Sequence, residues 1–147
     1  MSSVVFLCGI IVGMQCVDGP AVVEDDPAVD NPSWDHIPEL TATSFDDSVT
    51  VEGRFSMIEF YLPGCGSCEE MKEPVGNLYA RYSDSAFFGK VDKGKYTALA
   101  DKYGASVPPS FVFLKSGEPY DLKPGTPSEQ TLATVIEKGI AATKSGD

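Results

Sequence analysis

The sequence of 147 residues contains few basic residues and lacks a long apolar stretch. Its 11 lysines and arginines are outnumbered by 22 aspartates and glutamates, which gives a formal net charge of −11. Nucleic acids and anionic lipid surfaces attract basic patches, so this balance argues against both as partners. The apolar run at residues 4–14 is short compared with the roughly 20 apolar residues that span a bilayer, so we expect no stable membrane insertion.

Soft metal ligands are equally scarce. The sequence has four cysteines and one histidine, His36. Cys8 and Cys16 lie within the N-terminal apolar region, so a chain without that region keeps Cys65, Cys68 and His36. A structural zinc site needs four such ligands, so a zinc-binding protein is a poor alternative and no metal or organic cofactor is expected. The same count leaves no framework of structural disulfides.

The N-terminal residues 1–21 have the pattern of a secretory signal peptide. Residues 4–14 match its apolar region, and Gly19-Pro20-Ala21 offers small residues for cleavage. No Lys or Arg precedes the apolar run, so a short membrane anchor and a buried N-terminal strand stay open as alternatives. We expect location in the endoplasmic reticulum lumen or secretion. The sequence ends in Lys144-Ser-Gly-Asp147, without a KDEL-type signal, so retention would need a partner or an anchor.

The rest of the chain divides into a linker, one domain and a tail. Residues 22–36 are rich in Asp, Glu, Pro and Asn, which predicts an acidic linker. Near its end, Trp34 is interpreted as a packing residue and His36 as a surface residue, and neither is given a catalytic role. Regular patterning over residues 37–141 predicts a single domain, followed by a tail at residues 142–147.

Within the domain, strand and helix patterns alternate. They predict an α/β fold in which helices cover both faces of a mixed β-sheet. Strands are expected at residues 37–40, 55–61, 86–91, 110–114 and 119–122, the last two as a hairpin. Helices are expected at residues 41–49, directly after the cysteines, around residues 96–103, and after residue 126. For the last helix, Thr126-Pro127-Ser128-Glu129 predicts a capping box with proline at the first helical position.

The most informative motif is the C-x-x-C sequence Cys65-Gly66-Ser67-Cys68, which lies between a predicted strand and a predicted helix. A C-x-x-C pair alone is a weak signal, because half of many zinc sites has the same spacing. The flanking strand and helix favour a redox pair. A thiol at the N-terminus of a helix is stabilised as thiolate by the helix dipole, as dithiol–disulfide exchange requires.

Several stretches together resemble the thioredoxin-like domains, and most closely the catalytic domain of protein disulfide isomerases. These stretches are Glu39–Phe45, Glu59–Tyr61, Cys65–Cys68, Lys90–Asp92, Tyr103-Gly104, Pro109-Ser110 and Lys115-x-Gly117. They cover roughly residues 37–140. The resemblance implies a thioredoxin-like fold and a thiol–disulfide oxidoreductase that acts, as a monomer, on thiols and disulfides of proteins or peptides.

The resemblance also implies roles for the site residues. Cys65 is the expected nucleophile and Cys68 the more buried, resolving thiol, and their redox-active disulfide serves where other enzymes use a cofactor. Gly66, Ser67 and Pro109 are expected to contact substrate. Pro109 matches the family's cis-proline, although a plain extended loop stays open as an alternative.

Glu59 is a carboxylic acid in an otherwise apolar strand that should be central. Burial raises the pKa of such a group, so Glu59 is expected to accept a proton from Cys68. Lys90 lies at the matching place in the neighbouring predicted strand and is expected to pair with Glu59. A structural ion pair with no part in turnover is the alternative.

Departures from the family's pattern surround the cysteines. Gly64 stands where the family has Trp, Ser67 where it has His, and Glu69 and Glu70 where it usually has Lys. The change at Gly64 removes a stacking surface for substrate contact. The changes at Ser67, Glu69 and Glu70 remove positive charge near the thiols and predict a less oxidising couple than in a typical isomerase domain. They also support the alternative function, a chaperone-like binding module whose cysteines react slowly or not at all.

Overall fold

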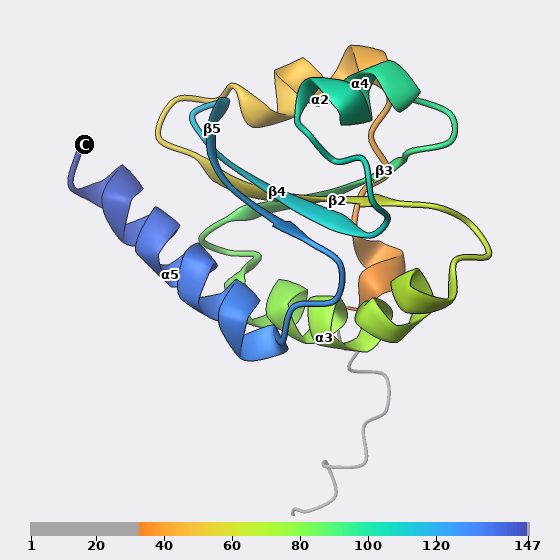
Figure 1. Cartoon of the computed structure of the whole chain (residues 1–147). Helices are drawn as coiled ribbons and strands as arrows, with labels where there is room; N and C mark the ends of the chain where they lie inside the picture. The colour runs from red at the N-terminus through yellow and green to blue at the C-terminus, as the bar shows by residue number, and fades with distance from the viewer. Residues whose placement is uncertain (1–32, 147) are drawn as a thin grey trace, which may run out of the picture. The chain divides into compact units, whose positions relative to one another are not determined.

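The computed structural model describes residues 33–146, so the predicted signal peptide and most of the predicted linker lie outside the described residues. In this part of the chain a four-stranded sheet has the order β3-β2-β4-β5 (Figure 1). Strand β2 (Phe55–Tyr61) pairs in parallel with β3 (Phe87–Asp92) and antiparallel with β4 (Ser110–Lys115). Strand β5 (Glu118–Pro124) forms the predicted hairpin with β4 and is one edge of the sheet.

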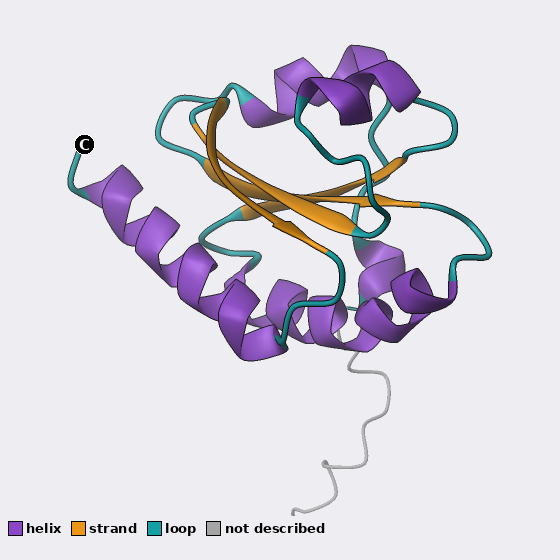
Figure 2. Cartoon of the chain, in the orientation of Figure 1, coloured by secondary structure: helices purple, strands orange, loops and turns teal. Residues whose placement is uncertain are grey.

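Helices cover both faces of this sheet, as predicted (Figures 1 and 2). Helices α2 (Ala42–Val49) and α4 (Thr97–Lys102) lie on one face, and α3 (Gly66–Tyr82) and α5 (Glu129–Lys144) lie on the other. The arrangement is a thioredoxin fold. Among the described residues, no helix combines the length and the apolar character needed to cross a membrane.

Alternation along β2 divides the core into two apolar clusters. Phe55 and Met57 pack in the cluster with α3 and α5, whereas Ile58 and Phe60 pack in the cluster with α2 and α4. Successive side chains of a strand point to opposite faces, so Glu59 shares the face of Phe55 and Met57. The sheet therefore presents a carboxylate toward the side whose helix α3 carries the cysteines.

Close packing of α5 against β2 depends on Gly139. A Cβ atom at this position would lie 2.0 Å from a ring carbon of Phe55. Glycine inside a helix costs about 1 kcal/mol relative to alanine, and here the buried contact with the aromatic ring offsets that cost. The absence of a side chain at Gly139 therefore lets α5 approach the sheet.

The start of α5 corrects the predicted capping box. Ser128, not Thr126, is the N-cap, and its hydroxyl accepts a hydrogen bond from the N–H of Thr131 at 3.1 Å. The preceding chain is still held in place, because the N–H of Gly125 donates to the carbonyl of Pro109 at 2.8 Å. The helix therefore begins two residues later than the sequence suggested.

The packed part of the chain extends past both predicted domain boundaries. Trp34–His36 forms a 3₁₀ helix, η3, and Trp34 is buried, although this residue was placed in the linker. At the other end, α5 continues to Lys144 and enters the predicted tail. Gly146 has φ of +78°, the left-handed conformation that commonly ends a helix. Helix α5 therefore ends after residue 141, the predicted end of the domain.

Residues 37–40, predicted as a strand, form only one isolated bridge, between Glu39 and Lys90 at the edge of β3. The N–H of Lys90 donates to the carbonyl of Pro38, and the N–H of Leu40 donates to the carbonyl of Lys90. Pro38 has no N–H and cannot continue the ladder. The segment therefore lies along β3 without becoming a further strand.

Candidate active site

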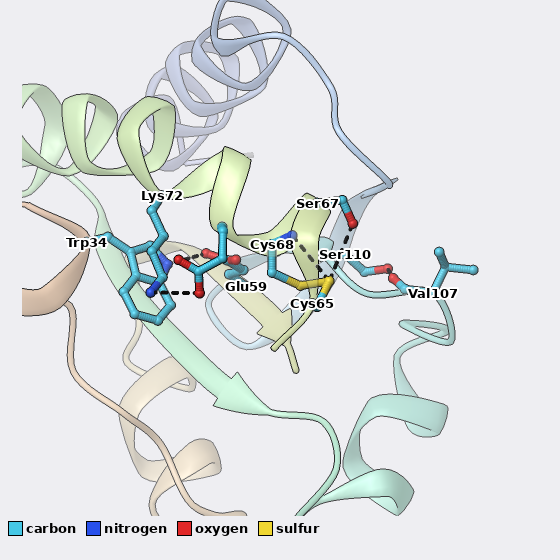
Figure 3. Close-up of a disulfide and its surroundings, with 9 residues drawn as sticks. Trp34, Glu59, Cys65, Ser67, Cys68, Lys72, Val107 and Ser110 are labelled. Carbon is cyan, nitrogen blue, oxygen red and sulfur yellow. Dashed lines mark hydrogen bonds and ion pairs between the residues drawn. A yellow bond between two sulfur atoms is a disulfide. The ribbon is translucent and has the colours of Figure 1, made fainter. Parts of the chain in front are cut away.

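A disulfide joins Cys65 and Cys68 at the N-terminus of α3 (Figure 3). Cys65 is the N-cap residue, and its Sγ accepts a hydrogen bond from the backbone N–H of Cys68 at 3.2 Å. Cys65 is half-buried, whereas Cys68 is 3% exposed. The Cys65 sulfur is therefore the more accessible one, and the helix N-terminus stabilises negative charge on it.

The residues next to Cys65 in the sequence have small, uncharged side chains or none. The hydroxyl of Ser67 lies 3.4 Å from its Sγ, so a hydrogen bond is available where the family supplies a histidine. Gly64, directly before it, has φ of +79°, a conformation that glycine adopts readily and other residues rarely adopt. Gly66 is exposed at the first position of α3. Access to the sulfur is thus open on this side.

Pro109 follows a cis peptide bond, as the resemblance implied, and not a trans extended loop. The loop that carries it is tied down at two points. The hydroxyl of Ser110 donates to the carbonyl of Val107, and the carbonyl of Pro109 accepts the hydrogen bond from Gly125. Val107 is 53% exposed, so this loop offers an apolar side chain to solvent.

Glu59 is 1% exposed, and Nε1 of Trp34 donates a hydrogen bond to its Oε1 at 2.7 Å (Figure 3). Its Oε2 is also buried and has no hydrogen-bond partner in the described protein. Burial raises the pKa of Glu59 to about 7, while the hydrogen bond from Trp34 and the positive charges of Lys90 and Lys72 limit the rise. This confirms the expected direction. An acid with such a pKa exchanges protons at neutral pH.

The expected ion pair between Glu59 and Lys90 is not formed, and no ion pair in the described part of the chain joins them. The two residues are neighbours in the register of β2 and β3. However, Nζ of Lys90 donates to the carbonyl of Trp34 at 3.1 Å and lies 3.7 Å from the centroid of its ring. Both charged groups therefore bind the same tryptophan. Burial lowers the pKa of Lys90, which opposes the effect of Glu39, Asp35 and Glu59.

A pocket of about 300 Å³ adjoins the disulfide on the α3 side. Its lining includes Trp34, Tyr61, Pro63, Gly64, Cys68 and Lys72. Lys72 pairs with Glu69 at 3.1 Å, and its Nζ lies 4.4 Å from the ring centroid of Trp34. Trp34 thus contacts both this pocket and the buried Glu59.

Trp34 is the site residue that sequence reasoning missed. Its one sequence signal is that it is the single tryptophan of the chain and stands just before the regular patterning begins. For metals, the described residues contain no cluster of three or more His, Cys, Asp or Glu side chains that could hold an ion. The groups of this site that can take part in thiol or proton chemistry are the two sulfurs and the buried carboxyl group.

A mixed sheet, a C-x-x-C disulfide at the start of an overlying helix and a cis-proline loop define a thioredoxin-like protein. Comparison with known families agrees with this geometry. The family model described as Thioredoxin matches residues 36–138. The chain belongs to the thioredoxin family.

Its relatives include both isomerases and thioredoxins. The chain is 33% identical over 105 residues to protein disulfide-isomerase tigA of Aspergillus niger, covering 68% of this chain and 29% of that protein. It is 27% identical over 104 residues to thioredoxin Y, chloroplastic, of Oryza sativa subsp. japonica, covering 71% of this chain and 62% of that protein. A mutant thioredoxin from Halobacterium salinarum NRC-1 superposes with a TM-score of 0.64 and 28% identity, covering 74% of this chain and 94% of the other. The chain thus spans less than two thirds of either curated relative.

Proposed function

We propose that this protein exchanges disulfides with other proteins or peptides, in the manner of a protein disulfide isomerase or reductase, in the secretory pathway. One observation carries the proposal: a half-buried sulfur at the N-cap of α3 is bonded to a buried sulfur one turn inside the helix. The likeness to isomerases and thioredoxins supports the reaction class. The leader-like pattern of residues 1–21 supports the compartment.

In the reducing direction, the thiolate of Cys65 attacks one sulfur of a substrate disulfide. This step forms a mixed disulfide and releases the other substrate sulfur as a thiolate. The thiolate of Cys68 then attacks Sγ of Cys65, which restores the Cys65–Cys68 disulfide and releases the second substrate thiolate. Two electrons pass from the dithiol to the substrate, and the reverse sequence oxidises a substrate dithiol.

Glu59 is proposed to take the proton that Cys68 loses before its attack. The strand parity of β2 directs this carboxyl group toward the α3 side, and its pKa of about 7 suits proton exchange near neutral pH. Lys90 and Lys72 favour the charged form of Glu59 without a direct ion pair from Lys90. Gly66, Ser67 and Pro109 are proposed to contact the substrate around Cys65.

An insulin-reduction assay with dithiothreitol tests the proposal. The wild type should accelerate reduction, and Cys65→Ser should lower the rate to that of dithiothreitol alone, because no nucleophile is left at the accessible position. Cys68→Ser should accumulate the mixed disulfide with the substrate, since it cannot resolve it. Equal rates for wild type and Cys65→Ser would refute the exchange function. Suppression of insulin aggregation without reduction would favour the chaperone-like binding module instead.

A further inference from the structure

The buried carboxyl group of the site depends on a residue from outside the family match. The family match begins at residue 36. The side chain that hydrogen-bonds to Glu59 is that of Trp34, which precedes the match and lies 25 positions before Glu59 in the chain. The same tryptophan accepts a hydrogen bond from Lys90 through its backbone carbonyl. A short N-terminal segment therefore reaches the centre of the redox site.

Helix α3 is shaped to receive this segment. A Cβ atom at Gly76, inside α3, would lie 3.0 Å from the backbone N of Trp34 and 3.3 Å from Cα of Ser33. Glycine inside a helix costs about 1 kcal/mol relative to alanine, so this position gives up helix stability for a close backbone contact. Ile37, at the end of the segment, is 3% exposed and anchors it in the core.

The indole itself is held from several sides. The ring of Tyr61 meets it edge-on, with centroids 5.3 Å apart and an interplanar angle of 86°. Nζ of Lys90 lies 3.7 Å and Nζ of Lys72 lies 4.4 Å from its centroid. Its N–H, its ring and its carbonyl are all engaged, so the orientation that serves Glu59 is fixed by packing.

We propose that Trp34 is a positioning residue of the redox site, which orients and covers the Glu59 carboxyl group and so controls its proton exchange with Cys68. The inference rests on the proposed role of Glu59 in turnover. It assigns a part of that role to the segment Ser33–Ile37, which precedes most of the matched domain.

The direction of the effect follows from the groups around Glu59. Lys90 from β3 and Lys72 from α3 favour the carboxylate, Tyr61 is the titratable neighbour on β2, and Phe111, opposite on β4, carries no charge. The indole N–H also favours the carboxylate, because it donates directly to Oε1. Replacing Trp34 by Phe keeps an aromatic ring and removes this donor, so Glu59 should hold its proton to a higher pH.

The first experiment uses Trp34 as the only tryptophan of the chain. In the oxidised protein the two cysteines do not titrate, so the indole emission should change with pH around the pKa of Glu59, about 7. Glu59→Gln should abolish this change. An equal pH response in both proteins would overturn the inference, and this test does not require the Trp34 variant to fold.

The second experiment compares wild type with Trp34→Phe. The Glu59 carboxyl carbon, followed by NMR in oxidised protein, should titrate about one pH unit higher in the variant, a shift equal to ~1.4 kcal/mol. The fraction of carboxylate at pH 7 then falls to about one fifth of its wild-type value, and the rising limb of the insulin-reduction pH profile should move in the same direction.

Tyr82→Phe is the matched control. It also removes an aromatic donor to a carboxylate, that of Glu137, but at the C-terminal end of α3, whereas the cysteines lie at its N-terminus. It should leave both the Glu59 titration and the pH profile unchanged. An unshifted Glu59 titration in Trp34→Phe, or an equal shift in Tyr82→Phe, would overturn the inference. A wild type without insulin reduction would refute the proposed function instead, while the Glu59 titration still decides the role of Trp34.

Discussion

The two faces of the sheet share one backbone but have different contents. On the α2 and α4 face, the cluster is built from side chains such as Phe45, Val49, Ile58 and Phe60, all fully buried. The α3 and α5 face also has a large apolar cluster, but the strand positions of this parity include Glu59, Lys90 and Asp92. These three are the buried acidic and basic side chains of the described residues.

The difference shows how a small domain accommodates a reactive site. Burying an ionisable group costs free energy unless hydrogen bonds and opposite charges compensate for the lost water. Glu59 is compensated at one oxygen by Trp34, whereas its second oxygen has no hydrogen-bond partner in the described protein. The face under α3 therefore gives up stability to hold a buried ionisable group, and the α2 and α4 face is expected to contribute stability alone.

The largest expected effect comes from the apolar face. Phe45 is fully buried, with ring centroids 5.3 Å from Tyr103 and 6.2 Å from Phe60. Phe45→Ala should lower the free energy of unfolding by about 3–5 kcal/mol, because it leaves a cavity and removes apolar burial. Urea unfolding of the oxidised protein measures this. At temperatures where the variant is folded, its disulfide-exchange rate should match the wild type. A slower exchange with little loss of stability would show that the two faces are not separated in this way.

Glu59→Gln tests the α3 and α5 face, and it should raise the free energy of unfolding where Phe45→Ala lowers it. The pKa of Glu59 is raised from 4.5 in the unfolded chain to about 7 in the folded protein, so the folded state binds the proton more tightly. The stability that proton binding by Glu59 gives to the folded state is therefore fully present below pH 4.5 and is lost as the pH rises through 7. The total loss is about 3 kcal/mol, from the difference between 4.5 and 7.

Gln keeps the shape and the acceptor for Trp34 but cannot ionise. Subtracting the unfolding free energies of the two proteins across pH 4–8 should thus reveal a gain for Glu59→Gln that grows with pH. The same variant should release the mixed disulfide more slowly, while the first attack on substrate is nearly unchanged. A stability difference that does not vary with pH would mean that Glu59 is not titrating inside the folded protein.

The smallest expected effect concerns the charge beside Cys65. Ser67 supplies a neutral hydroxyl 3.4 Å from the sulfur, and the nearby Glu69 is paired with Lys72. We expect a reduction potential of roughly −180 to −270 mV, between those of the isomerases and the thioredoxins. Ser67→His should raise it by about 30 mV, since a cationic imidazole favours the thiolate. Equilibration with glutathione buffers and thiol trapping measures both. A lower potential for Ser67→His would contradict the electrostatic explanation.

The sheet and the cysteine site could be predicted because their signals are local. The signals for these elements are the apolar run at Phe55–Tyr61, the hairpin pattern at residues 110–122 and the C-x-x-C spacing, and each lies within a few residues. The structure confirms these elements. The raised pKa of Glu59 was also predictable, because an acid inside a buried apolar strand loses its hydration whatever residues pack against it.

The partner of Glu59 could not be predicted by the same means. Trp34 follows a stretch with the composition of a linker, and its contact with Glu59 depends on tertiary packing across 25 positions. The expected ion pair between Glu59 and Lys90 was wrong. Strand register predicts that the two residues are neighbours, but it does not predict that Lys90 binds Trp34 instead. Similarly, Thr126 and Ser128 are both good N-caps by residue type, and the structure places the cap at Ser128, whose hydroxyl accepts a hydrogen bond from the N–H of Thr131.

The two outer strands of the sheet bear on how the protein avoids aggregation. An exposed strand edge can pair with the edge of another chain, and natural proteins often blunt such edges with prolines and charges. Edge strand β5 contains Pro119 and Pro124, which lack an N–H to offer, and an ion pair between Asp121 and Lys123 at 2.9 Å. At the opposite edge, the segment at residues 38–40 occupies the backbone groups of Lys90. Both borders of the sheet are thus poor templates for a neighbouring molecule's strand.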